Sequence, residues 1–179
     1  MFEWLSNFVE WMVSALPHWK IVTIKMGGVK YVKGRPKRIK SGSVVFWWPV
    51  TTEIALFPVV RQADDLRSQT LVTRDDKVIV VGGMVITEIA DALVFGTSSY
   101  DGGMTIIELT LTAVHDVICK MTWDELKQEQ QRGTLDTKLK NAAKGALQEY
   151  GVNVLKVMLT DMAPARVFKL LQATSSDGQ

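Results

Sequence analysis

Side chains that can take part in covalent chemistry recur at helical spacing in the second half of the sequence. Glu108, Thr112, His115 and Cys119 are separated by four, three and four residues, which places them on one face of a helix. A thiol beside an imidazole is the beginning of a nucleophile with its base, and a carboxylate can orient the imidazole. That chemistry also needs a pocket and donors for an oxyanion. The simpler interpretation is the polar side of an amphipathic helix or a contact between subunits, so we expect no catalytic residue and no enzyme.

No other pattern in the sequence predicts a cofactor or a metal. One cysteine and two histidines in 179 residues are too few for a structural zinc site, and a single cysteine cannot form an intrachain disulfide. The glycine pairs at 27–28, 82–83 and 102–103 do not have the spacing of a phosphate-binding loop. We therefore expect neither a cofactor nor a metal.

The elements expected before this polar stripe are strands. Alternating or β-branched runs predict strands at 21–26, 29–33, 51–57, 66–73 and 77–89. We expect the first two to form a hairpin around Gly27-Gly28. Gly82-Gly83 indicates a bulge inside the last run rather than its end.

Helical patterns follow the strands. The apolar stripe of the first helix consists of Met104, Ile107, Leu111, Val114 and Ile118. Thr122 and Glu125 have the spacing of a capping box that begins a second helix. Thr134 caps a third, which ends at Gly151. Its buried face consists of Leu135, Leu139, Ala142, Ala143, Ala146, Leu147 and Tyr150. We expect a final strand at 152–159 and a last helix from Pro164 to Leu171. Strands, then helices, then a strand are typical of an α+β domain.

The first nineteen residues differ in character from the rest of the chain. They contain two acidic residues and neither lysine nor arginine, and their polar residues recur every three or four positions. The segment is short and acidic for a bilayer span and lacks the features of a signal peptide. Because tryptophan prefers the lipid–water interface, we expect an amphipathic membrane-interface helix that lies in the plane of the membrane. The alternative is a helix docked on the protein's own core or on a neighbouring subunit. The expected membrane contacts in this segment are Phe2, Trp4, Leu5, Phe8, Trp11, Met12 and Trp19.

A second apolar run, at 44–50, contains the expected membrane contacts Phe46, Trp47 and Trp48. Side chains alternate along a strand, so the adjacent tryptophans cannot both point inward. We expect at least one of them to face lipid or a partner, and the alternative is a loop that covers the core.

Residues 20–40 carry eight basic and no acidic residues, whereas the rest of the chain is mildly acidic. Each lysine or arginine near an anionic leaflet contributes about 1 kcal/mol of attraction. The residues expected to contact anionic lipid are Lys20, Lys25, Lys30, Lys33, Arg35, Lys37, Arg38 and Lys40. The alternative is a solvated basic surface. Only Tyr31 is interleaved with these lysines, so we do not expect nucleic-acid binding.

Four segments, in this order, resemble the SPFH (band 7) family of stomatins, prohibitins and flotillins. They are the glycine, apolar run and proline at 39–49, the strand, turn and strand around Thr73-Arg74-Asp75, the helix start Thr122-Trp123-Asp124-Glu125, and the Tyr150-Gly151-Val152 strand, which Asp161 closes. The resemblance covers residues 20–171 and implies a membrane-associated scaffold that assembles into rings or cages. The chain departs from the family in its amphipathic anchor. It also ends at Gln179, where relatives usually continue into a long coiled-coil helix, and this puts a closed dome in doubt; the alternatives are a flat ring or a minimal partner that joins or caps another assembly.

The sequence therefore predicts three segments: a membrane anchor at 1–19, an SPFH-like domain at 20–172 and a flexible polar tail at 173–179. We expect a non-enzymatic, peripheral or monotopic membrane scaffold that self-assembles and organises lipid and membrane proteins. The partners expected are further copies of the chain and anionic lipids. The alternatives are a regulator of a membrane protease or channel, and a soluble structural subunit of a larger, possibly viral, assembly.

Overall fold

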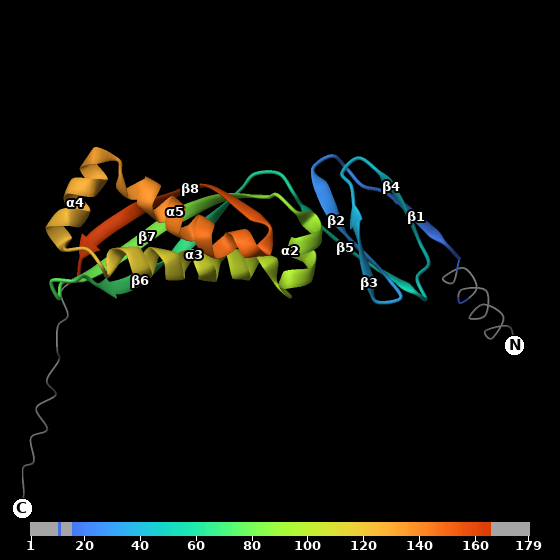
Figure 1. The fold of residues 1–179 in the computed structure, drawn as a ribbon, viewed down its shortest axis with the longest axis horizontal. Coiled ribbons are helices and arrows are strands. Elements are labelled where there is room, and N and C mark those ends of the chain that lie inside the picture. Colours follow the sequence, from blue (N-terminus) through green and yellow to red (C-terminus); the bar gives the residue numbers. More distant parts are fainter. Residues whose placement is uncertain (1–10, 12–15, 166–179) are drawn as a thin grey trace, which may run out of the picture.

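The computed structural model describes Trp11 and residues 16–165 (Figure 1). Several predictions therefore lie outside the described residues: the membrane contacts Phe2, Trp4, Leu5, Phe8 and Met12, and the polar tail. Trp11 is helical and exposed. The rest of the expected N-terminal helix is outside the described part.

The described chain is elongated and has two parts (Figure 1). The N-terminal part contains β1 (His18–Ile21), β2 (Met26–Val32), β3 (Arg35–Ile39), β4 (Val44–Trp47) and β5 (Thr52–Pro58). The C-terminal part contains β6 (Gln62–Val72), β7 (Val78–Ile89), α2 (Ala92–Ser98), α3 (Gly102–Ile118), α4 (Trp123–Arg132), α5 (Leu135–Leu147), the 3-10 helix η1 (Gln148–Tyr150) and β8 (Val152–Pro164). Strands precede helices and a strand closes the chain, so the expected α+β class is confirmed.

The N-terminal part packs a two-stranded ribbon on a three-stranded sheet. β1 pairs with β4, and β2 lies between β3 and β5, all antiparallel. The small core between the two layers is formed by Val22, Ile39 and Val45. The ribbon lies at the end of the molecule opposite α4 (Figure 1).

The hairpin expected at Gly27-Gly28 is wrong, because both residues lie inside β2. The tight turn falls instead at Lys33-Gly34, where both residues have positive φ, as a type I′ hairpin requires. This position of β2 requires glycine, because a Cβ atom on residue 28 would lie 2.1 Å from the carbonyl oxygen of Ala55 on β5. The glycine pair thus marks close approach of two backbones, not a turn. The strand expected at 21–26 is correspondingly displaced and lies at 18–21.

The C-terminal part has one sheet, in the order β6-β7-β8, with α3 and α5 packed on one face. The expected bulge at Gly82-Gly83 is confirmed, because the register between β7 and β8 shifts there. The predicted stripe of α3 is partly right. Leu111, Val114 and Ile118 are buried, whereas Met104 is exposed and its place in the core is taken by Ile106.

The helix ends follow the sequence closely. The Thr122 and Glu125 capping box is present, and Gly151 adopts the left-handed conformation at the end of η1. Thr134 precedes α5, but its side chain makes no capping hydrogen bond. The last helix was expected to begin at Pro164, which is wrong, because Pro164 is the final residue of β8 and pairs with Ile79.

Helix α2, which the sequence did not predict, joins the two parts. It packs on β2 and β3, and the Tyr31 hydroxyl donates a 2.6 Å hydrogen bond to the carbonyl of Gly96. The Phe57 and Phe95 rings meet edge to face with centroids 4.9 Å apart. The three-stranded sheet is therefore covered by α2 on one face and by the ribbon on the other.

Candidate functional site

The outer face of the ribbon is apolar, and it is exposed among the described residues. Its cross-strand pairs are Trp19 with Phe46 and Ile21 with Val44, and the register places all four side chains on one face. Their exposed fractions are 75, 61, 75 and 53 %, and the Trp19 and Phe46 rings are 6.3 Å apart. We call these four residues the apolar platform. Soluble surfaces seldom expose contiguous apolar side chains of this size unless they bind something.

The inner face of the ribbon carries His18, Lys20, Val45 and Trp47. Val45 is buried against the three-stranded sheet, and Trp47 is half-buried. Trp48, the next residue, is exposed. The expectation that the adjacent tryptophans cannot both point inward is confirmed.

Exposed apolar side chains continue at both ends of the apolar platform. Ile24 lies in the turn that follows β1, close to Gly42, and Trp48 and Val50 lie after β4. Leu16, just before β1, is exposed as well. The surface therefore runs along the outer end of the molecule in Figure 1.

A basic groove of about 450 Å³ borders the apolar platform. Lys30, Lys37, Arg38 and Lys40 line it together with the β4 residues Val44 and Phe46. Lys30 and Lys37 are directly opposite each other on β2 and β3, and the Lys30 ammonium donates a hydrogen bond to the carbonyl of Phe46. Like charges placed opposite each other repel, so an anion bound between Lys30 and Lys37 would offset the repulsion between the two ammonium groups.

Arg38 differs from the other predicted lipid contacts. It alternates with Lys37 on β3, so its side chain lies toward α2, where it forms an ion pair with Asp91. The guanidinium, followed by the Val94 amide, holds the pKa of Asp91 below its usual value. Arg38 therefore helps to fasten α2 to the sheet.

The remaining predicted cations are spread over the N-terminal part. Lys20 lies beside Trp47, Ile54 and Leu56 in a separate shallow groove. Lys25, Lys33 and Arg35 are exposed, Lys25 in the turn between β1 and β2, and Lys33 in the turn between β2 and β3.

The polar stripe of α3 is occupied by structural contacts. The Glu108 carboxylate forms an ion pair with Arg67 on β6, so it is not available to orient an imidazole. The His115 imidazole lies 3.4 Å from Oδ1 of the neighbouring Asp116 instead. Arg67, Glu108, Thr112 and His115 line a groove of about 390 Å³, which Cys119 does not reach.

Two of the family-like segments contact each other at the far end of the molecule. Asp75, in the turn between β6 and β7, accepts hydrogen bonds from the Thr73 hydroxyl at 2.7 Å and the Trp123 amide at 3.0 Å. The Thr73 hydroxyl first, and then the Lys77 ammonium, lower the pKa of Asp75. These motifs are thus a joint between the β6–β7 turn and α4.

Within residues 16–165 no single helix is long and apolar enough to cross a bilayer. Helices α3 and α4 together have sufficient length and apolar character, but their axes are bent by 113° relative to each other. In the same part of the chain, no three His, Cys, Asp or Glu side chains are grouped in a way that could hold a metal ion.

Comparison with models of protein families identifies a match over most of the chain. The sequence model of the SPFH domain / Band 7 family matches residues 21–175, most of the chain. No curated protein matches the chain. The matched region includes the basic strand β3 and the apolar strand β4, and it begins immediately after Lys20.

Proposed function

The chain belongs to the SPFH domain / Band 7 family, and from this premise we propose that it self-assembles on a membrane surface and organises lipids and membrane proteins there. Proteins of this family are generally membrane-associated, typically oligomerise, and act as scaffolds rather than enzymes. The proposal assigns the membrane-facing role in this chain to the end that carries β1 and β4.

The uncovered apolar platform is the observation that carries the proposal. Trp19 and Phe46 present large rings to solvent, with 75 and 61 % of their surface exposed. Burial of apolar surface stabilises by about 25 cal/mol per Å² removed from water, so the platform favours any apolar environment that is offered to it. An aromatic pair on a rigid ribbon suits the lipid–water interface, where one side of a side chain is apolar and the other wet.

The basic groove supplies the second attraction. Lys30, Lys37 and Lys40 lie immediately beside Val44 and Phe46, so a phosphate near the lysines would leave its acyl chains at the platform. Clustered lysines attract an anionic leaflet. Arg38 contributes less, because it is paired with Asp91. The assignments of 1–19 as an additional anchor, of 20–172 as the domain and of 173–179 as a tail are parts of the same proposal.

Co-flotation of the full chain with vesicles tests the proposal. A Trp19→Ser, Phe46→Ser variant should lose most binding to both zwitterionic and anionic vesicles. A Lys30→Gln, Lys37→Gln variant should lose only the preference for anionic vesicles. Val72→Ser, which alters an exposed apolar side chain on β6, is the matched control and should bind normally. Unchanged flotation of the Trp19 and Phe46 variant would exclude the platform as the membrane contact.

A neighbouring subunit is the competing occupant of the apolar platform, because a protein surface also removes apolar side chains from water. In that case the chain is a structural subunit, and it should form defined oligomers without lipid or detergent that the Trp19→Ser, Phe46→Ser variant breaks apart. A regulator of a membrane protease or channel would share the membrane contact. Crosslinking in native membranes distinguishes the two: a regulator yields a defined adduct with one protease or channel, whereas a scaffold yields chiefly adducts between copies of the chain.

A further inference from the structure

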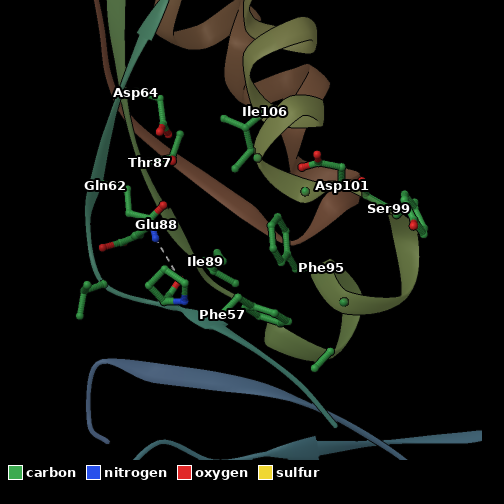
Figure 2. A pocket seen from close by; sticks show the side chains of 17 residues that line it. Phe57, Gln62, Asp64, Thr87, Glu88, Ile89, Phe95, Ser99, Asp101 and Ile106 are labelled. Atoms are coloured by element: carbon green, nitrogen blue, oxygen red, sulfur yellow. Dashed lines mark hydrogen bonds between the residues drawn. The ribbon is translucent and has the colours of Figure 1, made fainter. Parts of the chain in front are cut away.

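A cavity of about 600 Å³ lies at the junction of the two parts, away from the ribbon (Figure 2). Its lining comes from β5, from the adjoining ends of β6 and β7, and from α2 and the start of α3. Phe57, Phe95, Ile89 and Ile106 form an apolar wall around it. The edge contact between the two phenylalanine rings fixes part of this wall. Such a volume and such a lining are typical of a site for a small molecule.

The charged side chains that line the cavity are all carboxylates. Asp64, Glu88 and Asp101 contribute to the lining, and none of the described lining residues is lysine, arginine or histidine. The cavity thus has the opposite charge to the basic groove beside the apolar platform. Figure 2 shows Asp64 beside Thr87 on the strand side of the cavity and Asp101 on the helix side, with the Ile106 side chain between them in this view.

The three carboxylates differ in what compensates their charge. The Glu88 carboxylate accepts a 2.8 Å hydrogen bond from the side-chain amide of Asn153 and lies 3.7 Å from Nε of Arg61. Asp101 caps α3 by accepting a hydrogen bond from the Met104 amide. Asp64 is half-buried, and no described residue gives it a hydrogen bond or an ion pair. Its register partner Val85 is buried, so Asp64 lies on the face of the sheet that the helices cover.

We propose that this cavity binds a small organic cation, a protonated amine carried on an apolar body. The ammonium would lie between Asp64 and Asp101, and the apolar body would pack on Phe57, Phe95 and Ile106. A partly buried carboxylate without a partner is best stabilised by an opposite charge within a few ångströms. Aromatic faces add attraction for a cation. An anion is disfavoured by the same carboxylates. The site is independent of the membrane proposal, because the three-stranded sheet separates it from the apolar platform.

Phenethylamine is the probe, with phenethyl alcohol as its neutral counterpart and hydrocinnamate as an anionic one. Binding to the full chain in a neutral detergent is followed at neutral pH through the amide resonances of Gly102 and Gly103, which line the cavity. The amine should bind most tightly and the anion least. Asp64→Asn and Asp101→Asn should each weaken amine binding about threefold, and the double variant about tenfold. Asparagine caps helices as well as aspartate does, so Asp101→Asn keeps the start of α3.

Asp65→Asn is the matched control, because Asp65 is exposed and pairs with Met84, one position away from Asp64 on the opposite face of the sheet. It removes the same charge and should leave amine binding unchanged. Binding of phenethyl alcohol should be equal in all variants, which shows that the apolar wall is intact. Equal affinity of the wild-type chain for the amine and the alcohol would overturn the proposal. So would amine binding that Asp65→Asn weakens as much as Asp64→Asn does.

Discussion

The two parts of the molecule use apolar residues in opposite ways. The C-terminal part buries them in one continuous core between the sheet and α3, α4 and α5. The N-terminal part buries only Val22, Ile39 and Val45 in its own small core, and it displays most of the large apolar side chains that are exposed among the described residues. Apolar residues thus stabilise the core in one part and form an outward-facing surface in the other. Exposure, rather than apolar content, distinguishes the two parts and is the basis of the proposed membrane contact.

The largest effect that tests this contrast is expected from a cavity in the C-terminal core. Leu139 is fully buried on α5, so Leu139→Ala should lower the free energy of unfolding by about 3 kcal/mol, measured by urea denaturation. Ile21→Ala, at a highly exposed platform position, should change it by less than about 0.5 kcal/mol.

Membrane binding should show the reverse order. Ile21→Ala should weaken vesicle binding, whereas Leu139→Ala should leave it intact under conditions in which the variant is folded. If Ile21→Ala destabilised the chain as much as Leu139→Ala, the platform would belong to a core, and the contrast between the two parts would be lost.

The junction between the parts gives the next largest effect. A Cβ atom on Gly96 of α2 would lie 2.6 Å from Val29 Cγ2 and 3.2 Å from the Phe57 ring. Gly96→Ala should therefore lower the free energy of unfolding by about 2 kcal/mol through overpacking. Tryptophan fluorescence reports mainly on the N-terminal part, since Trp123 is the only tryptophan beyond residue 48, and far-ultraviolet circular dichroism reports mainly on the helices. Gly96→Ala should separate the two unfolding transitions.

Gly103→Ala is the matched control for the junction. A Cβ atom there meets only Asp101 Oδ1, at 3.6 Å, and alanine is a better helix former than glycine by about 0.5–1 kcal/mol. This variant should be neutral or slightly more stable, with coincident transitions. Coincident transitions in Gly96→Ala as well would show that the two parts unfold as one unit irrespective of α2.

The limits of sequence-based prediction are clearest in the N-terminal part. The apolar run that becomes β4 was recognised, but its partner β1 is more than twenty residues away, and nothing local specifies that pairing. The Gly27-Gly28 pair was interpreted as a turn because glycine is common in turns. Here it permits β2 to approach β5, a requirement that only the tertiary structure reveals.

Local signals were reliable in the C-terminal part. The spacing of Thr122 and Glu125 was sufficient to predict the start of α4, because a capping box involves only neighbouring residues. Thr122→Ala should therefore lower stability by about 1 kcal/mol, and Thr122→Ser should restore it. The Thr134 hydroxyl makes no capping bond and donates instead to the Glu129 carboxylate, so Thr134→Ala removes a surface contact rather than a cap and should have a smaller effect. Equal losses at the two positions in urea denaturation would contradict the capping assignment.

The candidate sites were predictable to different degrees. The aromatic and basic residues of the end proposed to face the membrane are clustered within the first fifty residues, so composition alone drew attention to them. The cavity in Figure 2 joins residues from β5, β6, β7, α2 and α3, and α2 itself was not expected. Arg38 was grouped with the lipid contacts because of its charge, and only the alternation of side chains along β3 placed it beside Asp91.

The smallest expected effect is a pH dependence at the joint between the β6–β7 turn and α4. Hydrogen bonds from Thr73 and the ion pair with Lys77 lower the pKa of Asp75 in the folded state. A carboxylate with a lowered folded-state pKa contributes stability that is complete above its unfolded-state pKa, about 3.9, and is lost as the pH falls toward the folded-state value. Asp75→Asn should therefore lower the Tm at neutral pH by a few degrees and flatten its decline below about pH 4. Asp76→Asn removes the same charge from a neighbouring side chain that makes no ion pair with the described residues, at a φ of 58° that asparagine also adopts. It should leave the decline unchanged, and an equal flattening in both variants would mean that net charge, rather than the contacts of Asp75, sets the acid sensitivity of this end of the molecule.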